Sequence, residues 1–146
     1  MTTVFLDANV YFAAFFSDTG ASALILEFAN RGKITVFASK LVLREADRNL
    51  RKKSSPAKLK AFHRFLQQTK IKILPPPEEA SLKPYEEIIH PKDVPVLGAA
   101  VASKADYLIT LDRKHFLNPK VMDKLQKIKI LTPADFIRDI VLKGKL

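Results

Sequence analysis

The stretch Val4-Phe5-Leu6-Asp7-Ala8-Asn9-Val10-Tyr11 (residues 4–11) joins two apolar runs through a short polar break that contains Asp7 and Asn9. Residues 4–6 have the β-branched and aromatic composition of a buried strand. Residues 10–16 carry apolar side chains at helical spacing. The stretch therefore predicts a strand followed by a helix, with Asp7 at the carboxyl end of the strand.

The same alternation continues to the end of the chain. Further strands are predicted over residues 34–37, 71–74, 107–110 and 128–131. Helices are predicted over residues 21–30, 40–53, about 56–66, 93–102, 121–125 and 133–141. Residues 78–90 are less regular and predict one short helix, interrupted at Pro84. Such alternation is typical of an α/β domain whose mostly parallel sheet is covered by helices on both faces, and the length of 146 residues predicts a single domain, 1–146.

The composition of the chain is strongly basic. Lys and Arg number 25 against 15 Asp and Glu, a net charge of +10. This excess favours a polyanionic partner such as RNA, although a basic protein without such a partner fits it too. The absence of cysteine excludes disulfides, thiolate zinc sites and cysteine nucleophiles. We expect the first residues to form a strand rather than a signal peptide, and the apolar stretch at 10–16 is too short to span a membrane. We therefore expect a cytoplasmic protein.

Four acidic residues fall where a metal site would need them: Asp7, Glu45, Asp93 and Asp112. Asp7 and Asp112 each follow a predicted strand, and ligand sites of parallel sheets lie beyond the carboxyl ends of strands. The helix that begins at Asp93 leads into the strand before Asp112, and Glu45 lies on a helix at the flank. Clustered carboxylates suit Mg²⁺ or Mn²⁺, as one or two ions, and they repel one another, so we expect raised pKa values without metal.

Each of these acids also has a purely structural explanation. Asp7 could begin a turn with Asn9, and Asp93 could cap its helix. Glu45 could be a solvated helix residue. Asp112 could be a loop acid paired with Arg113.

Basic residues flank two of the acids. Arg44, Arg48, Arg51 and Lys52 form a stripe at helical spacing beside Glu45. Arg113 and Lys114 follow Asp112 directly. Both groups could bind phosphates of RNA, while the alternative for the stripe is a solvated helix face. His115 could act as a general acid or be incidental, whereas His63 and His90 have no acid at ligand spacing. Five phenylalanines at helical spacing predict core or homodimer contacts: Phe12, Phe15, Phe16, Phe62 and Phe65.

Three segments resemble PIN-domain nucleases, in order and at suitable spacing. They are residues 6–11 (Leu-Asp-Ala-Asn-Val-Tyr), 93–100 (Asp-Val-Pro-Val-Leu-Gly-Ala-Ala) and 105–112 (Ala-Asp-Tyr-Leu-Ile-Thr-Leu-Asp). The chain is most similar to the toxin-type PIN proteins of prokaryotic toxin–antitoxin pairs. It departs from the family in Pro95, just inside its helix, and in the long, proline-rich segment 54–91.

The resemblance implies a three-layer α/β/α domain with a central sheet of about five strands. It also implies an endoribonuclease dependent on Mg²⁺ or Mn²⁺, neutralised by a cognate antitoxin. The four acids match the acidic positions of the family, and Asn9 and Thr110 match its supporting positions. Two other functions stay open: an inert PIN-fold module that binds RNA or protein, and an α/β phosphate-ester hydrolase. Haloacid-dehalogenase-like phosphatases, which this alternative would resemble, have a second acid two residues after the nucleophile. Asn9 occupies that place here, which counts against the hydrolase.

Overall fold

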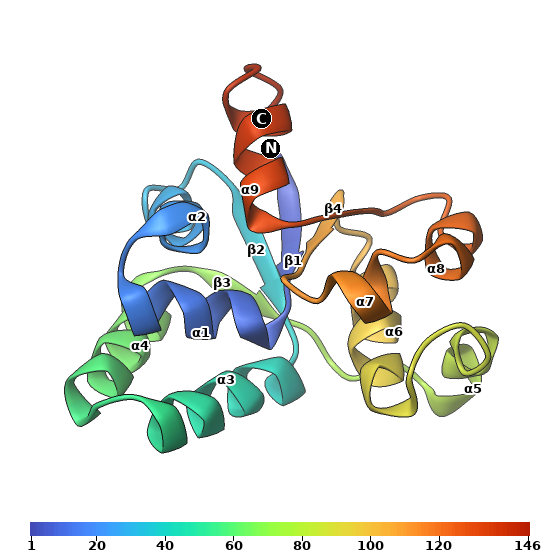
Figure 1. Cartoon of the computed structure of the whole chain (residues 1–146), viewed down its shortest axis with the longest axis horizontal. Helices are drawn as coiled ribbons and strands as arrows, with labels where there is room; N and C mark the ends of the chain where they lie inside the picture. The colour runs from blue at the N-terminus through green and yellow to red at the C-terminus, as the bar shows by residue number, and fades with distance from the viewer.

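The computed structural model describes residues 1–146 and contains one five-stranded parallel sheet (Figure 1). The strands are β1 (Thr3–Leu6), β2 (Thr35–Ala38), β3 (Ile71–Ile73), β4 (Tyr107–Ile109) and β5 (Lys129–Leu131). Their order across the sheet is β3-β2-β1-β4-β5, and every neighbouring pair is parallel. The α/β architecture predicted from the alternation is confirmed, with strand bounds that differ by one or two residues.

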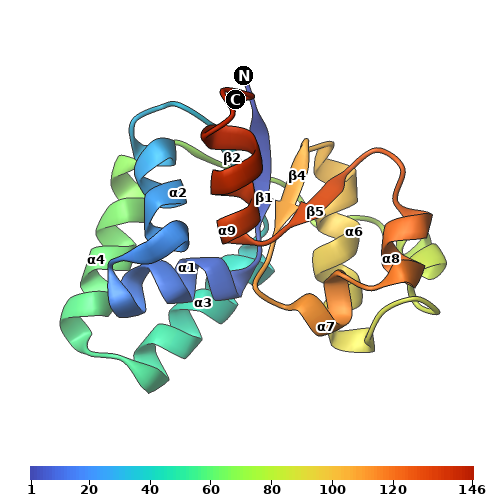
Figure 2. The same cartoon turned by 45° about the horizontal axis from the view of Figure 1, so that its top comes forward.

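Helices cover both faces of this sheet, as Figure 2 shows. One face carries α1 (Ala8–Ser17), α2 (Gly20–Asn30), α3 (Lys40–Lys53), α4 (Pro56–Gln68) and α9 (Pro133–Phe136). The other face carries α5 (Glu79–Leu82), α6 (Val94–Ser103), α7 (Arg113–Phe116) and α8 (Pro119–Lys124). None of the helices alone has the length and apolar character of a membrane span; α1 and α2 reach them only together, and the pair is bent by 101°.

The irregular segment and the two short last helices differ in detail from the prediction. Residues 78–90 contain α5 and a 3-10 turn at Lys83–Tyr85, and a second 3-10 turn at Pro91–Asp93 leads into α6. The helix α7 was not predicted, since four residues are too few to show periodicity. The closing helix continues beyond α9 as a π-helical turn, Ile137–Val141.

Local sequence signals explain where the main helices begin. Asp7 caps α1, Ser39 caps α3 through the backbone N–H of Val42, and Ser55 caps α4. Such side-chain oxygens satisfy N–H groups that have no partner inside the helix. Pro56 occupies the first turn of α4, where its missing N–H costs nothing.

The hydrophobic core lies on both faces of the central strand. Val4, Phe5 and Leu6 of β1 are fully buried, as a strand between two helical layers must be. Phe62 and Phe65 of α4 are buried too, which confirms their predicted core role. Phe16 at the end of α1 remains 44% exposed. The core therefore holds β1 rigidly and fixes the position at which Asp7 leaves it.

The strand order reverses between β1 and β4. From β1 the chain moves to β2 and β3 on one side, while β4 leads to β5 on the other. Leu6 is in register with Ile109, and the backbone N–H of Asp7 donates to the carbonyl of Ile109 at 3.0 Å. In open α/β sheets a crevice opens at this reversal, beyond the carboxyl ends of the strands. The fold thus brings the residues after Leu6 and Ile109 to one place.

Candidate active site

Asp7 is the innermost acid of the crevice, with 7% of its surface exposed. Its Oδ1 accepts from the backbone N–H of Ala8 at 2.7 Å, which caps α1. Its Oδ2 accepts from the hydroxyl of Thr110 at 2.8 Å and from the amide of Asn9 at 3.3 Å. A buried carboxylate needs such donors to compensate for lost hydration. Asp7 therefore caps α1, where the sequence suggested a turn with Asn9, and it is also the floor of an acidic site.

Asn9 and Thr110 connect the two strand ends. The Asn9 side chain donates to the Thr110 hydroxyl at 3.3 Å and accepts from the backbone N–H of Leu111 at 3.1 Å. The same hydroxyl accepts from the backbone N–H of Asp112 at 3.1 Å. Thr110 is fully buried. Through these hydrogen bonds both residues hold the loop after β4 against Asp7, which is the contact expected of residues that support the acids.

Asp112 caps the short helix α7. Its Oδ1 accepts from the backbone N–H of His115 at 3.0 Å, and its Oδ2 lies 2.8 Å from Nδ1 of the same residue. Since a carboxylate only accepts, Nδ1 of His115 carries the hydrogen in this contact. Asp112 does not form the ion pair with Arg113 that was considered from the sequence. It pairs with His115 instead.

Asp93 presents an unpaired oxygen to the site. Only 13% of its side chain is exposed, and its Oδ2 is buried without a hydrogen-bond partner. Asp93 makes no side-chain cap to α6, so capping does not explain it. The Oδ2 lies 3.7 Å from Nδ1 of His115. A buried carboxylate oxygen without a hydrogen bond is costly, and a bound cation would compensate it. Pro95, in the first turn of α6, does not displace Asp93 from the site.

Glu45 completes the group from the middle of α3, where it is half-buried. Burial raises the pKa of Asp7 to about 6, the charges of Glu45 and Asp93 add to the rise, and hydrogen bonds from Thr110 and Ala8 oppose it. Glu45 is therefore close enough to Asp7 to influence its ionisation. The charges of Glu45 and Asp93 thus act on Asp7, and the charge of Asp112 acts on Asp93, which links the four predicted acids electrostatically.

The pKa values of Asp93 and Asp112 shift in opposite directions. Burial and the charge of Asp112 raise the pKa of Asp93. Partial burial also acts to raise the pKa of Asp112, but the hydrogen bonds from the backbone and ring of His115 outweigh it, and the pKa is lowered. The expectation of uniformly raised values is therefore wrong for Asp112, because His115 stabilises its ionised form.

The donor set fits a hard divalent cation. One potential ligand atom each from Asp93, Asp112 and His115 lies within 4.8 Å of the others. Because Nδ1 of His115 carries a hydrogen toward Asp112, the carboxylates are the available ligands in this arrangement. Carboxylate oxygens suit Mg²⁺ and Mn²⁺. Because Oδ2 of Asp93 also lacks a hydrogen bond, this set can hold such an ion.

The sequence alone did not decide whether His115 belongs to the site or is an incidental loop residue. The structure brings its ring against Asp112 and within 5.6 Å of the ring of His90, measured between centroids. Its position three residues after a helix-capping acid was the available signal, because i and i+3 side chains meet on a helix. His63, which showed no partner in the sequence, pairs with Asp47 and connects α3 with α4.

The predicted phosphate-binding residues are all at the surface: Arg44, Arg48, Arg51, Lys52, Arg113 and Lys114. Arg51 is held by Asp47 at 3.1 Å, whereas Arg44 and Arg48 make no ion pair. Arg113 and Lys114 lie on α7, directly beside Asp112. The stripe on α3 is therefore free for anions at Arg44 and Arg48 and partly neutralised at Arg51.

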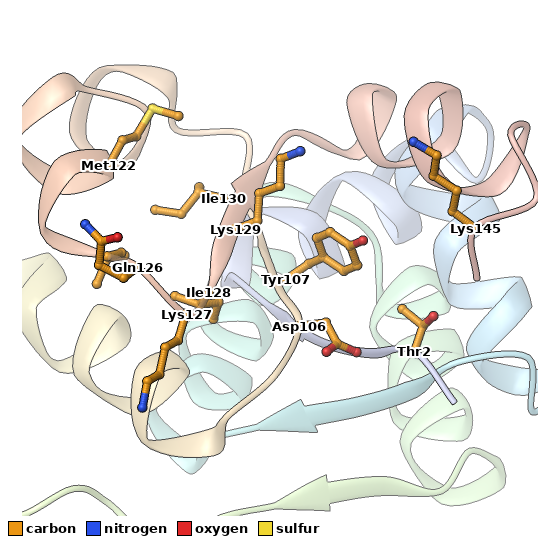
Figure 3. Close-up of a pocket in the computed structure, with 11 residues that line it drawn as sticks. Thr2, Asp106, Tyr107, Met122, Gln126, Lys127, Ile128, Lys129, Ile130 and Lys145 are labelled. Carbon is orange, nitrogen blue, oxygen red and sulfur yellow. The ribbon is translucent and has the colours of Figure 1, made fainter.

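A cavity of about 650 Å³ lies at the opposite edge of the sheet (Figure 3). It is lined by Thr2, Asp106 and Lys129, at the amino-terminal ends of β1, β4 and β5, and by the loop before β5. Asp106 is engaged there by the backbone and hydroxyl of Thr3. None of the four clustered acids lines this cavity, so it is separate from the candidate active site.

The fold and the site together define a parallel α/β domain with a carboxylate cluster at the switch point of its sheet. The family model of the PIN domain matches residues 3–114, and the chain belongs to this family. Ten chains of solved structures are similar. One is the crystal structure of VapBC2 from Rickettsia felis bound to a DNA fragment from their promoter, with 17% identity, a TM-score of 0.61 and coverage of 90% of this chain and 98% of that chain. That likeness supports the fold, and no curated protein matches this chain.

Proposed function

We propose that this PIN-domain protein is an endoribonuclease dependent on Mg²⁺ or Mn²⁺, with Asp7, Glu45, Asp93 and Asp112 as its catalytic and metal-binding acids. The convergence of these four acids carries the proposal, and the unpaired buried oxygen of Asp93 is its sharpest element. A site of this kind takes one or two ions. Structural acids would instead be paired or solvated, as Asp47 and Asp139 are.

Each side chain has a distinct part in the chemistry. A bound divalent ion would lower the pKa of a coordinated water and offset charge on the phosphate. Asp93 and Asp112 would hold the ion, and Asp7 would orient the attacking water from the floor of the site. Asn9 and Thr110 keep Asp7 and Asp112 in register. His115 keeps Asp112 ionised, and its Nε2 is free of any hydrogen bond within the protein.

RNA is the proposed substrate because the surface around the acids is basic. The net charge of +10 attracts polyanions, and four exposed basic residues lie on α3, which carries Glu45, and on α7, which Asp112 caps: Arg44, Arg48, Arg113 and Lys114. Each phosphate that such a residue neutralises releases counterions, which makes binding depend on salt. In this proposal, Arg48→Ala and Lys114→Ala each reduce the slope of log affinity against log salt by about 0.7.

We further propose that the protein is the toxin of a toxin–antitoxin pair and acts in the cytoplasm. The structural neighbour from Rickettsia felis is VapBC2 bound to a fragment of promoter DNA, which supports an antitoxin partner by analogy of fold. A homodimer is proposed through the end of α1, where Phe12 stacks on the exposed Phe16 at 5.2 Å between ring centroids. Exposed aromatic surface of this kind favours association.

Cleavage assays with matched variants test the nuclease proposal. The protein is incubated with labelled single-stranded and hairpin RNA in Mg²⁺, in Mn²⁺ and in EDTA, beside Asp7→Asn and the exposed control Asp123→Asn. We expect cleavage by wild type and the control, and none in EDTA or with Asp7→Asn. Cleavage that persists in EDTA and with Asp7→Asn contradicts the metal mechanism. Binding without cleavage would favour the inert module, and turnover of phosphomonoesters alone would favour the hydrolase.

A further inference from the structure

A groove of about 450 Å³ lies at the carboxyl ends of β2 and β3. Its walls are apolar: Leu41 of α3, Ile73 of β3, the segment Pro75-Pro76-Pro77 and Pro95 of α6. Leu41 and Ile73 are 45% and 51% exposed, which is unusual for such side chains at neighbouring positions. Arg44 of the groove precedes Glu45, and Pro95 lies two residues after Asp93. The groove and the candidate active site therefore share the helices α3 and α6, and both lie at the carboxyl edge of the sheet, where β2 neighbours β1.

The charged residues of this groove are all basic. Lys40 and Arg44 line it, and none of its lining residues is acidic. Neither side chain makes an ion pair within the protein. An occupant with an apolar face and a negative charge at its edge would match both the walls and the rim. An unpaired nucleotide has these properties, since each base has an apolar face and is joined to a phosphate.

The proline wall of the groove is fixed in place. The backbone N–H of Leu74 donates to the carbonyl of Ala38 at 2.9 Å, which continues the pairing of β3 with β2 up to the prolines. On the other side, Pro77 and Leu82 pack against Gly98 of α6. A Cβ at position 98 would overlap Cδ2 of Leu82 and lie 3.7 Å from Cγ of Pro77. The groove is thus preformed by close packing between the proline segment and α6.

The same prolines disfavour a peptide as the occupant. Proline has no N–H, so residues 75–77 cannot donate the ladder of hydrogen bonds with which an exposed edge captures a peptide strand. A base needs no such donors to pack against an apolar wall. The size of the groove lies in the range of roughly 300–1,000 Å³ that suits small ligands, and a base inside a duplex could not enter it.

We propose that this groove holds an unpaired nucleobase next to the cleaved phosphodiester, with Lys40 and Arg44 on the flanking phosphates. This inference rests on the proposed nuclease function and narrows its substrate to RNA that is single-stranded at the cleavage site. It also gives a role to the proline-rich departure of this chain from its family. Leu41 and Ile73 contact the base and determine which nucleotide is preferred.

Binding measurements test the groove independently of cleavage. A fluorescein-labelled 12-nucleotide single-stranded RNA and its annealed duplex are titrated in EDTA with wild type, with Leu41→Ser/Ile73→Ser, and with Leu142→Ser as a control at an exposed leucine outside the groove. We expect the double variant to lose roughly tenfold in affinity for the single strand, and the control to lose none. Thermal unfolding verifies that the variants are folded, and Leu41→Ser alone replaces the double variant if that one is not.

A cleavage experiment separates this inference from the proposed function. A random-sequence RNA pool is digested with Mg²⁺, and the cleavage sites are mapped for wild type and the double variant. We expect a nucleotide preference beside the cut that the double variant loses. Equal binding and equal preference in both proteins would overturn the groove as a base-binding site while leaving the nuclease intact. Binding that depends on Leu41 and Ile73 without any cleavage would support the groove and overturn the nuclease.

Discussion

The hydroxyl of Thr110 donates a 2.8 Å hydrogen bond to Oδ2 of Asp7, although 103 positions separate the two residues. The same oxygen of Thr110 accepts from the backbone N–H of Asp112 at 3.1 Å. One buried hydroxyl thus joins the ends of β1 and β4 and sets the distance between two acids. Parallel pairing of Leu6 with Ile109 makes this contact possible, because it releases both chains at the same edge.

Thr110→Val removes this hydroxyl and keeps the shape of the side chain. We expect the variant to lose about 2 kcal/mol of stability, since a buried carboxylate loses a charge-assisted hydrogen bond. We also expect weaker binding of Mg²⁺ or Mn²⁺, because Asp7 then ionises less readily. Urea unfolding and calorimetric metal titration measure the two effects. Thr110→Ser retains the hydroxyl, so we expect it to keep the stability and the metal affinity of the wild type. Equal behaviour of the valine and serine variants would show that the hydroxyl does not support Asp7.

The pKa of Asp7 predicts how stability depends on pH in the metal-free protein. Burial raises the pKa of this carboxyl to about 6 in the folded chain, against an ordinary value of 3.8. Between these values the unfolded chain loses the proton first, so the folded state binds more protons and its stability falls as pH rises. The loss attributable to Asp7 reaches about 3 kcal/mol by pH 7.

The comparison with Asp7→Asn isolates this contribution from other groups. Unfolding by urea in EDTA is measured from pH 4 to pH 8 for both proteins. The wild type should lose stability relative to Asp7→Asn between pH 4 and pH 7, and saturating Mg²⁺ should reverse the loss. Parallel curves across this range would show that Asp7 titrates normally.

His115 determines the ionisation of Asp112. Its ring and backbone donate to that carboxylate at 2.8 and 3.0 Å and lower its pKa against the effect of burial. His115→Ala removes the ring but keeps the backbone donor, so the pKa of Asp112 should rise. Carbon-detected NMR titration of the carboxyl group measures the shift. His63→Ala is the matched control, because it pairs with Asp47 rather than Asp112, and the pKa of Asp112 should not change there.

The sequence predicted the parts of this site that depend on strand ends and missed those that depend on side-chain packing. Asp7 and Asp112 follow apolar runs, and the parallel arrangement of the strands brought them together. The helix that leads into β4 brought Asp93 toward the same edge, whereas Glu45 was placed mainly through family resemblance, since a helix face alone does not fix what a side chain approaches. The contact of His115 with Asp112 arises in α7, whose four residues carry no periodicity. The lowered pKa of Asp112 could not be predicted without that contact.

Asp93 provides the most direct test that the cluster is a metal site. Its buried Oδ2 has no partner, and burial and the charge of Asp112 raise its pKa. Asp93→Asn removes the charge with little change in size, so the variant should unfold at a higher temperature than wild type in EDTA at pH 7.5. In Mg²⁺ the order should reverse, because only wild type gains stability from the bound ion. Differential scanning calorimetry measures both, with the exposed Asp123→Asn as control. An Asp93→Asn protein that is less stable than wild type in EDTA, and equally stabilised by Mg²⁺, would identify Asp93 as a structural acid whose oxygen is satisfied by water.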